Sequence, residues 1–291
     1  MYLQHFKLSE LPFSITPDTS FFMNRAGYQD ALNVLVIALR SGEGFIKITG
    51  EVGVGKTLLC RTLMKTVNKE FVTAYIHNPY IKPESLLFSI ADALAVEYES
   101  GTSQHMLMKL ITRALLDTHR KGRKVVVCLD EVQAMPVQTL ESLRLLTNLE
   151  TEKRKLIQVI LFGQPELDLL LNQPSVRQLK QRITFSYRLL PLNKVAAFAY
   201  IRHRLLIAGC SDNGLFSKRA CDAIYRHSKG IPRLINILCH KSLIVAYGEG
   251  LNKVSHKNVN LAALDIEHAK DKPESWFNSL LPAFSKRLFG S

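Results

Sequence analysis

The chain has 291 residues, of which 47% are hydrophobic, so it can form one large domain and a smaller one, each with its own core. No apolar run approaches the roughly 18 to 20 residues that span a bilayer, and the first residues lack the blocks of a signal peptide, which argues against a membrane-spanning protein and favours a cytoplasmic one. The net charge of +13 at pH 7 is compatible with an acidic partner.

Hydrophobic periodicity predicts alternating helices and strands in the first two thirds of the chain. Helices are expected at 29–39, 58–67, 83–96, 104–119 and 136–149, and strands at 45–49, 71–76, 125–129 and 156–162. Such alternation is typical of a parallel α/β sheet. From residue 193 the pattern indicates helices only, at 194–208, 217–227, 231–247 and 255–264.

We therefore predict an α/β domain over 1–191, a helical domain over 192–265 and a C-terminal tail over 266–291, with Pro191 at the first boundary. The tail carries apolar residues at every fourth position beside two basic ones, so a helix there would be amphipathic and basic. These residues are Trp276, Leu280, Phe284, Leu288, Lys286 and Arg287. Docking to the chain's own core or to a partner is favoured over contact with the inner-membrane surface, because the stretch is short.

A phosphate-binding loop follows the strand at 45–49 and reads Gly-Glu-Val-Gly-Val-Gly-Lys-Thr. Glycines let the backbone curl round a phosphate and point its N–H groups inward. Lys56 would contact the β- and γ-phosphates, and Thr57 would bind Mg²⁺. The predicted nucleotide-binding residues are Gly50, Glu51, Val52, Gly53, Val54, Gly55, Lys56, Thr57 and Leu58. This pattern arises by chance in about one chain in a hundred of this length.

Two carboxylates stand where the apolar strand at 125–129 ends. Ligands of open α/β sheets lie at the carboxyl ends of strands. Asp130 would hold Mg²⁺ through its water shell, and Glu131 would accept a proton from the water that attacks the γ-phosphate. Alone, the pair could be a solvated strand end; together with the phosphate loop it predicts binding and hydrolysis of a nucleoside triphosphate.

Other chemistries have little support in the sequence. The five cysteines form no Cys-x-x-Cys and mostly fall in apolar patterns, so they are expected to be buried free thiols. The nine histidines show no metal-ligand spacing, and no Gly-x-Ser-x-Gly is present, so neither a zinc enzyme nor a serine hydrolase is indicated.

Most of the excess positive charge lies between residues 177 and 241. This segment contains thirteen Lys and Arg residues but only two Asp residues, so its net charge is +11. This segment could neutralise bound triphosphate, face an acidic neighbouring subunit or bind nucleic acid. A solvated basic face would account for much of it as well.

Several stretches resemble the general secretion pathway protein A family of AAA+ ATPases, and look even more like the ATPase of mannose-sensitive haemagglutinin (MSHA) pilus biogenesis. They are 44–57, 140–150, 163–167, 178–183 and 230–238. The resemblance covers roughly residues 1–265 and implies a P-loop NTPase core of the AAA+ type with a C-terminal helical lid, acting on ATP with Mg²⁺. Members of the family continue into a membrane-spanning segment and a peptidoglycan-binding domain, whereas this sequence ends at Ser291, so direct binding to the cell wall is not expected.

The resemblance also implies roles for single residues. Gln164 is similar to the sensor-1 group that positions the lytic water, and Arg233 to the sensor-2 arginine of the lid. Arg182 is similar to the arginine finger offered to the neighbouring subunit's site, with Arg177 as the alternative, which implies a nucleotide-dependent homo-oligomer. Asn78 would restrain Glu131 when a partner is absent. The apolar segment around Phe13 resembles a cover for the adenine, although core packing accounts for it equally well.

Two functional classes remain open. In the first, ATP hydrolysis drives assembly of a type IV pilus of the MSHA kind, or a related secretion apparatus, through envelope proteins at the inner membrane. In the second, the basic helical region binds DNA, as in AAA+ proteins of transposition and replication initiation. Against DNA, no winged-helix or helix-turn-helix module follows the lid; in its favour is the +11 segment. A slow nucleotide-dependent switch is a third, milder possibility.

Overall fold

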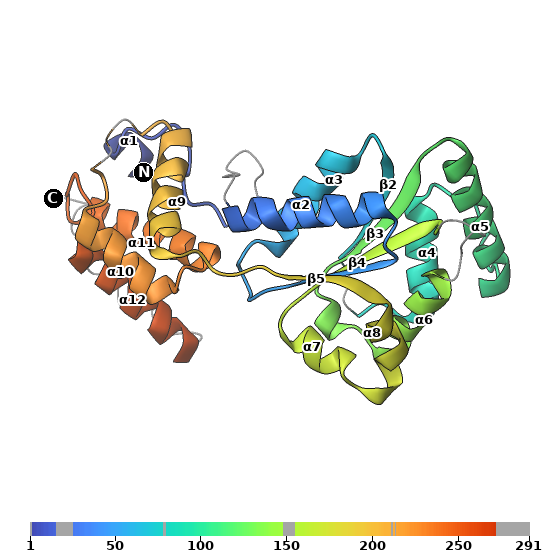
Figure 1. The fold of residues 1–291 in the computed structure, drawn as a ribbon. Coiled ribbons are helices and arrows are strands. Elements are labelled where there is room, and N and C mark those ends of the chain that lie inside the picture. Colours follow the sequence, from blue (N-terminus) through green and yellow to red (C-terminus); the bar gives the residue numbers. More distant parts are fainter. Residues whose placement is uncertain are drawn as a thin grey trace. The chain divides into compact units, whose positions relative to one another are not determined.

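The computed structural model describes residues 2–15, 26–77, 80–147, 155–210, 212 and 214–271. The chain forms two compact units, one made of Asn24–Leu190 and the other of Met1–Met23 together with Pro191–Ser291 (Figure 1). The first contains a β-sheet with its covering helices, and the second is helical. In the part of the chain that the structure describes, no helix combines the length and the apolar character needed to cross a membrane.

The sheet of the α/β unit is parallel and has the strand order β2-β3-β4-β1-β5. Its strands are β1 (Phe45–Thr49), β2 (Phe71–Ile76), β3 (Lys124–Leu129), β4 (Ile157–Gly163) and β5 (Ile183–Arg188). The strands β3 and β4 lie inside the sheet, and the described side chains of β4 are all buried. This confirms the parallel α/β sheet expected from the alternation of elements.

Helices cover both faces of the sheet (Figure 1). The helices α2 (Ala26–Ser41) and α3 (Lys56–Val67) pack on one face, where Val126 and Cys128 of β3 point. The other face, to which Val125 and Val127 point, is covered by helices that lie later in the chain. They are α4 (Pro83–Ala93), α5 (Gln104–Arg120), α6 (Val137–Thr147), α7 (Glu166–Leu171) and α8 (Arg177–Arg182), with short 3-10 turns η2 (Val132–Ala134) and η3 (Pro174–Val176). Side chains of β3 are buried on both faces, as its uninterrupted apolar run predicts.

The helical unit contains α9 (Lys194–Ile207), α10 (Lys218–Ser228), α11 (Pro232–Gly248) and α12 (His256–Asp271), with the short α1 (Tyr2–His5). Local signals explain where these helices begin. Asn193 and Ser217 accept hydrogen bonds from backbone N–H groups of the first turns of α9 and α10, and Pro232 occupies the first turn of α11. The four long helices confirm the expectation of a helical C-terminal region.

The N-terminal residues differ from the predicted domain limits. Residues 1–191 are predicted to form one domain, whereas residues 2–15 belong to the helical unit and contribute side chains to its core. Tyr2, Phe6 and Phe13 are buried there, and the ring of Phe13 meets that of Phe216 edge-on at 5.9 Å. The physical reason is the burial of large aromatic surface. Core packing thus accounts for Phe13.

Four of the five cysteines are buried and all five are free thiols, as the sequence indicated; Cys221 is half-buried. The predicted tail lies largely outside the described residues, because the structure describes the chain only to residue 271. The apolar and basic residues proposed for an amphipathic helix there are all in that part.

Candidate nucleotide-binding site

The phosphate loop connects the end of β1 to the start of α3, as the sequence predicted. Gly53 and Gly55 have φ angles of 81° and 109°, a region of backbone conformation that L side chains rarely adopt. A Cβ on Gly50 would lie 2.7 Å from the carbonyl oxygen of Leu189, so that position has no room for a side chain. The glycines therefore permit both the curvature of the loop and its close approach to the residue that follows β5.

Lys56 is buried at the start of α3, with a relative exposure of 5%. Its Nζ donates to the carbonyl oxygens of Gly50 at 2.7 Å and Glu51 at 3.2 Å, so the ammonium group lies inside the loop. Burial lowers the pKa of Lys56, and the nearby carboxylates of Glu131 and Asp130 partly offset this. The loop thus holds a positive charge at the position where an anionic ligand needs it.

Asp130 follows β3 and its side chain is fully buried. Its Oδ2 accepts hydrogen bonds from Thr57 Oγ1 at 2.8 Å and from the Tyr75 hydroxyl at 3.0 Å, while its Oδ1 accepts from the backbone N–H of Glu131 at 3.0 Å. His77 Nδ1 lies 3.7 Å from Oδ2. Burial first, and then the charge of Asp130, raise the pKa of Tyr75, so its hydroxyl remains a donor. The hydroxyl and carboxylate oxygens at this point are the ligand type that Mg²⁺ prefers.

Glu131 has a φ angle of 55°, in the left-handed region that is unusual for a residue with a Cβ. Its Oε2 accepts hydrogen bonds from the side-chain amides of Gln133 at 2.7 Å and Gln164 at 3.0 Å. Partial burial disfavours the charged form, but the two amides and the charge of Lys56 outweigh it, and the pKa of Glu131 lies below its ordinary value. A carboxylate held this way is ionised at neutral pH.

The structure brings five predicted residues together at the carboxyl edge of the sheet: Lys56, Thr57, Asp130, Glu131 and Gln164. Their neighbours Gln133 and Tyr75 were missed by the sequence analysis. Gln133 follows Glu131 by two residues in a short turn, and Tyr75 lies on β2, next to β3. The strand adjacency that brings Tyr75 to Asp130 is a property of the sheet order, which the sequence analysis did not predict.

The two candidate arginine fingers lie on α8, and the candidate sensor-2 arginine lies on α11. Arg182 is half-buried at the end of α8, and its Nη1 donates to the carbonyl oxygen of Arg144 at 3.3 Å. Arg177 is exposed at the start of the same helix. Arg233 is exposed near the start of α11, in the helical unit. Asn78 falls outside the described residues.

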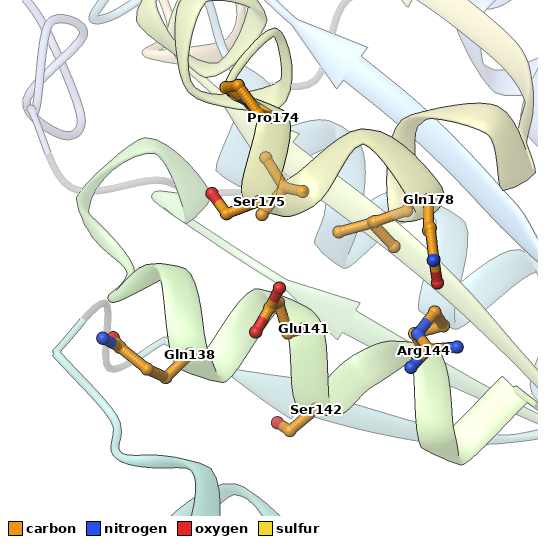
Figure 2. Close-up of a pocket in the computed structure, with 9 residues that line it drawn as sticks. Gln138, Glu141, Ser142, Arg144, Pro174, Ser175 and Gln178 are labelled. Atoms are coloured by element: carbon orange, nitrogen blue, oxygen red, sulfur yellow. The ribbon is translucent and has the colours of Figure 1, made fainter.

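A cavity of about 400 Å³ lies between α6 and the η3–α8 segment, close to the helix that carries Arg182. Most of its lining side chains are polar, and Figure 2 shows Gln178 of α8 pointing toward Arg144 of α6. None of the phosphate-loop residues lines it. It is therefore a feature separate from the candidate nucleotide-binding site.

Comparison with known proteins agrees with this geometry. Residues 39–171 match the family model of the AAA domain, and this range includes the phosphate loop, Asp130, Glu131 and Gln164. These residues therefore have an AAA P-loop fold. The chain is 42% identical to general secretion pathway protein A of Aeromonas hydrophila over 288 residues, which are 99% of this chain and 52% of that protein. The chain thus spans about half the length of this relative.

Solved structures support the same fold. The chain matches the Aeropyrum pernix ORC1 protein in complex with DNA with a TM-score of 0.65 and 17% identity, over 90% of this chain and 71% of that one. It matches the Thermotoga maritima RuvB Holliday junction branch migration motor with a TM-score of 0.58 and 15% identity, over 88% and 73% of the two chains. At these identities the likeness shows the shared P-loop fold alone.

Proposed function

We propose that the site formed by the phosphate loop, Asp130 and Glu131 binds and hydrolyses ATP, and that hydrolysis drives assembly of a pilus or a related secretion apparatus at the inner membrane. The observation that carries the catalytic part is the hydrogen bond of Gln164 to Glu131 at 3.0 Å, beside the Thr57–Asp130 pair. The observation that favours the cellular role is the 42% identity to a general secretion pathway protein.

The residues present fit a magnesium-bound triphosphate. Gly50 has no room for a side chain, Gly53 and Gly55 curve the loop, and Lys56 supplies a buried cation. Residues 50–58 would bind the nucleotide, and Thr57 and Asp130 would hold Mg²⁺. The chemistry that Mg²⁺ supplies when bound is neutralisation of charge on the phosphate oxygens.

Glu131 would act as the general base. Its carboxylate is ionised and half-buried, and two amides fix its orientation. A base must be unprotonated and must lie within hydrogen-bonding reach of the water whose proton it accepts. Gln164 would position the same water through its side chain, since it already contacts the base.

Oligomerisation would complete the site. Arg182, or Arg177 as the alternative, would reach the site of a neighbouring subunit as an arginine finger, and Arg233 of the helical unit would act as sensor 2. Asn78 would restrain Glu131 in the absence of a partner. Proteins of this organisation respond to nucleotide by closing one domain over another, which is how hydrolysis would be converted into work on envelope proteins.

The cellular role is tested by genetic complementation. In cells that lack the native gene, the wild-type chain should restore assembly of the surface apparatus, measured by electron microscopy of the cell surface, whereas Glu131→Gln should not. The matched control Glu141→Gln changes an exposed glutamate on α6 and should complement fully. Full complementation by Glu131→Gln would contradict the proposal that hydrolysis drives assembly.

A second candidate function is nucleic-acid binding, because α10 presents a basic surface. Lys218, Arg219 and Arg226 are exposed on this helix, while Asp222 is paired with Lys194 at 2.6 Å. The test is ATP hydrolysis with and without duplex DNA at near-physiological salt, where weak counterion-driven binding is suppressed. Strong stimulation that is lost when the three cations are replaced by Gln would favour a DNA-associated ATPase; indifference to DNA would favour the assembly function.

A further inference from the structure

The side-chain amide of Gln133 connects the candidate base to the candidate sensor. Its Nε2 donates to Glu131 Oε2 at 2.7 Å, and its Oε1 accepts from the backbone N–H of Gln164 at 2.9 Å. Glu131 follows β3, and Gln164 follows β4. One amide group therefore links the ends of two neighbouring strands at the point where the chemistry takes place.

The position of Gln133 is itself well fixed. It lies in the turn η2, where the N–H of Ala134 donates to the Glu131 carbonyl at 3.0 Å and the N–H of Met135 donates to that of Val132 at 3.1 Å. Val132, the first residue of this turn, is fully buried in the hydrophobic core. A Cβ on Gly163 would lie 3.2 Å from Gln133 Oε1, so the amide is packed closely against the end of β4.

We propose that Gln133 is a positioning residue for ATP hydrolysis. Its side-chain amide holds the carboxylate of Glu131 in a fixed position relative to Gln164. The inference rests on the proposed role of Glu131 as general base. Glutamine suits the position because its amide offers a donor and an acceptor in one planar group. Glutamate would keep the acceptor for the Gln164 N–H but lose the donor to Glu131, and alanine would lose both.

The experiment compares Gln133→Ala and Gln133→Glu with wild type and with the matched control Gln138→Ala, an exposed glutamine on α6. In both Gln133 variants kcat should fall roughly 10- to 100-fold, the cost of misplacing a catalytic group, with KM for ATP within about twofold. Binding of fluorescent ATP and the thermal unfolding temperature should stay close to wild type, and Gln138→Ala should resemble wild type throughout.

Several outcomes would overturn the inference. An unchanged kcat in Gln133→Ala would show that the link is dispensable. Wild-type behaviour of Gln133→Glu would show that only the contact to the Gln164 backbone matters. A loss of turnover accompanied by weaker nucleotide binding and a lower unfolding temperature would show a merely structural role.

A parallel measurement on Glu131→Gln separates this inference from the proposal beneath it. If that variant keeps wild-type turnover, the assignment of Glu131 as base is wrong. If it loses turnover while the Gln133 variants retain it, only the inference about Gln133 fails.

Discussion

Thr57 and Asp130 are 73 positions apart in the sequence, yet Thr57 Oγ1 donates a hydrogen bond to Asp130 Oδ2 at 2.8 Å. The bond joins the start of α3 to the end of β3. These two elements meet because β4 pairs with both β1 and β3, so that the carboxyl ends of the three strands share one edge of the sheet. Loop and carboxylate are therefore parts of one site.

Replacing Asp130 by Asn should impair the use of Mg²⁺. The amide keeps the volume but removes the charge that attracts the cation, so ATP turnover should fall by about 10²-fold or more at fixed Mg²⁺ and recover partly at high Mg²⁺. The measurement is turnover against Mg²⁺ concentration. The control is Asp117→Asn, which changes a half-buried aspartate on α5 that pairs with Arg120; this variant should show the wild-type dependence on Mg²⁺. If Asp130→Asn depends on Mg²⁺ as wild type does, the assignment of Asp130 as a metal ligand is wrong.

Gly230→Ala should destabilise the helical unit. Gly230 has a φ angle of 76°, and a Cβ there would lie 2.0 Å from the carbonyl oxygen of Leu192. A clash with backbone cannot be relieved by a side-chain movement, so we expect a loss of about 2 kcal/mol or more in the free energy of unfolding. Urea unfolding followed by circular dichroism measures it. Gly248→Ala is the control, because a Cβ there meets nothing within 4 Å; equal stability of the two variants would contradict the structure.

Arg204→Met should loosen the N-terminal segment from the helical unit. The buried guanidinium donates to the carbonyl oxygens of Pro12 and Ser14 and to the Tyr200 hydroxyl. A buried carbonyl group that loses its hydrogen-bond donor lowers the free energy of unfolding by about 1 to 3 kcal/mol. Limited proteolysis should cut the variant within its first 15 residues faster than wild type, whereas Arg202→Met, an exposed arginine on the same helix, should be cut at the wild-type rate.

Arg182→Ala should spare nucleotide binding and abolish the part of the activity that depends on assembly. Arginine fingers contribute ~10³ to 10⁵ in rate. Specific ATPase activity of wild type should rise with protein concentration, while that of the variant should stay low and flat. Arg177→Ala serves as the comparison and should retain the rise. If specific activity is independent of concentration in wild type and survives in Arg182→Ala, the shared-site proposal is wrong.

Much of this arrangement follows from short sequence patterns. The apolar run of β3 and the alternation of β1 predict buried strands, and the glycines and Lys56 predict the loop between β1 and α3. These signals are local, since each depends on residues close in sequence. The same is true of the helices after residue 193.

Other features depend on contacts between distant residues and were not predicted. No element was predicted for residues 183–188, although Ile183, Phe185 and Tyr187 alternate with polar residues as in an edge strand. Among the described strands, β5 pairs with β1 alone. The burial of Phe13 against Phe216 joins residues some two hundred positions apart. The left-handed backbone of Glu131, which directs its carboxylate to two amides, has no sequence signal of its own.

The most direct measurement is steady-state ATP hydrolysis by Glu131→Gln beside wild type and Glu141→Gln, with binding of fluorescent ATP measured on the same preparations. Wild type and Glu141→Gln should hydrolyse ATP in a Mg²⁺-dependent way, and Glu131→Gln should bind ATP with wild-type affinity but lose turnover, because an amide cannot accept the proton. Undiminished hydrolysis by Glu131→Gln would contradict the assignment of Glu131 as the base, and absence of hydrolysis by wild type would contradict the proposed function.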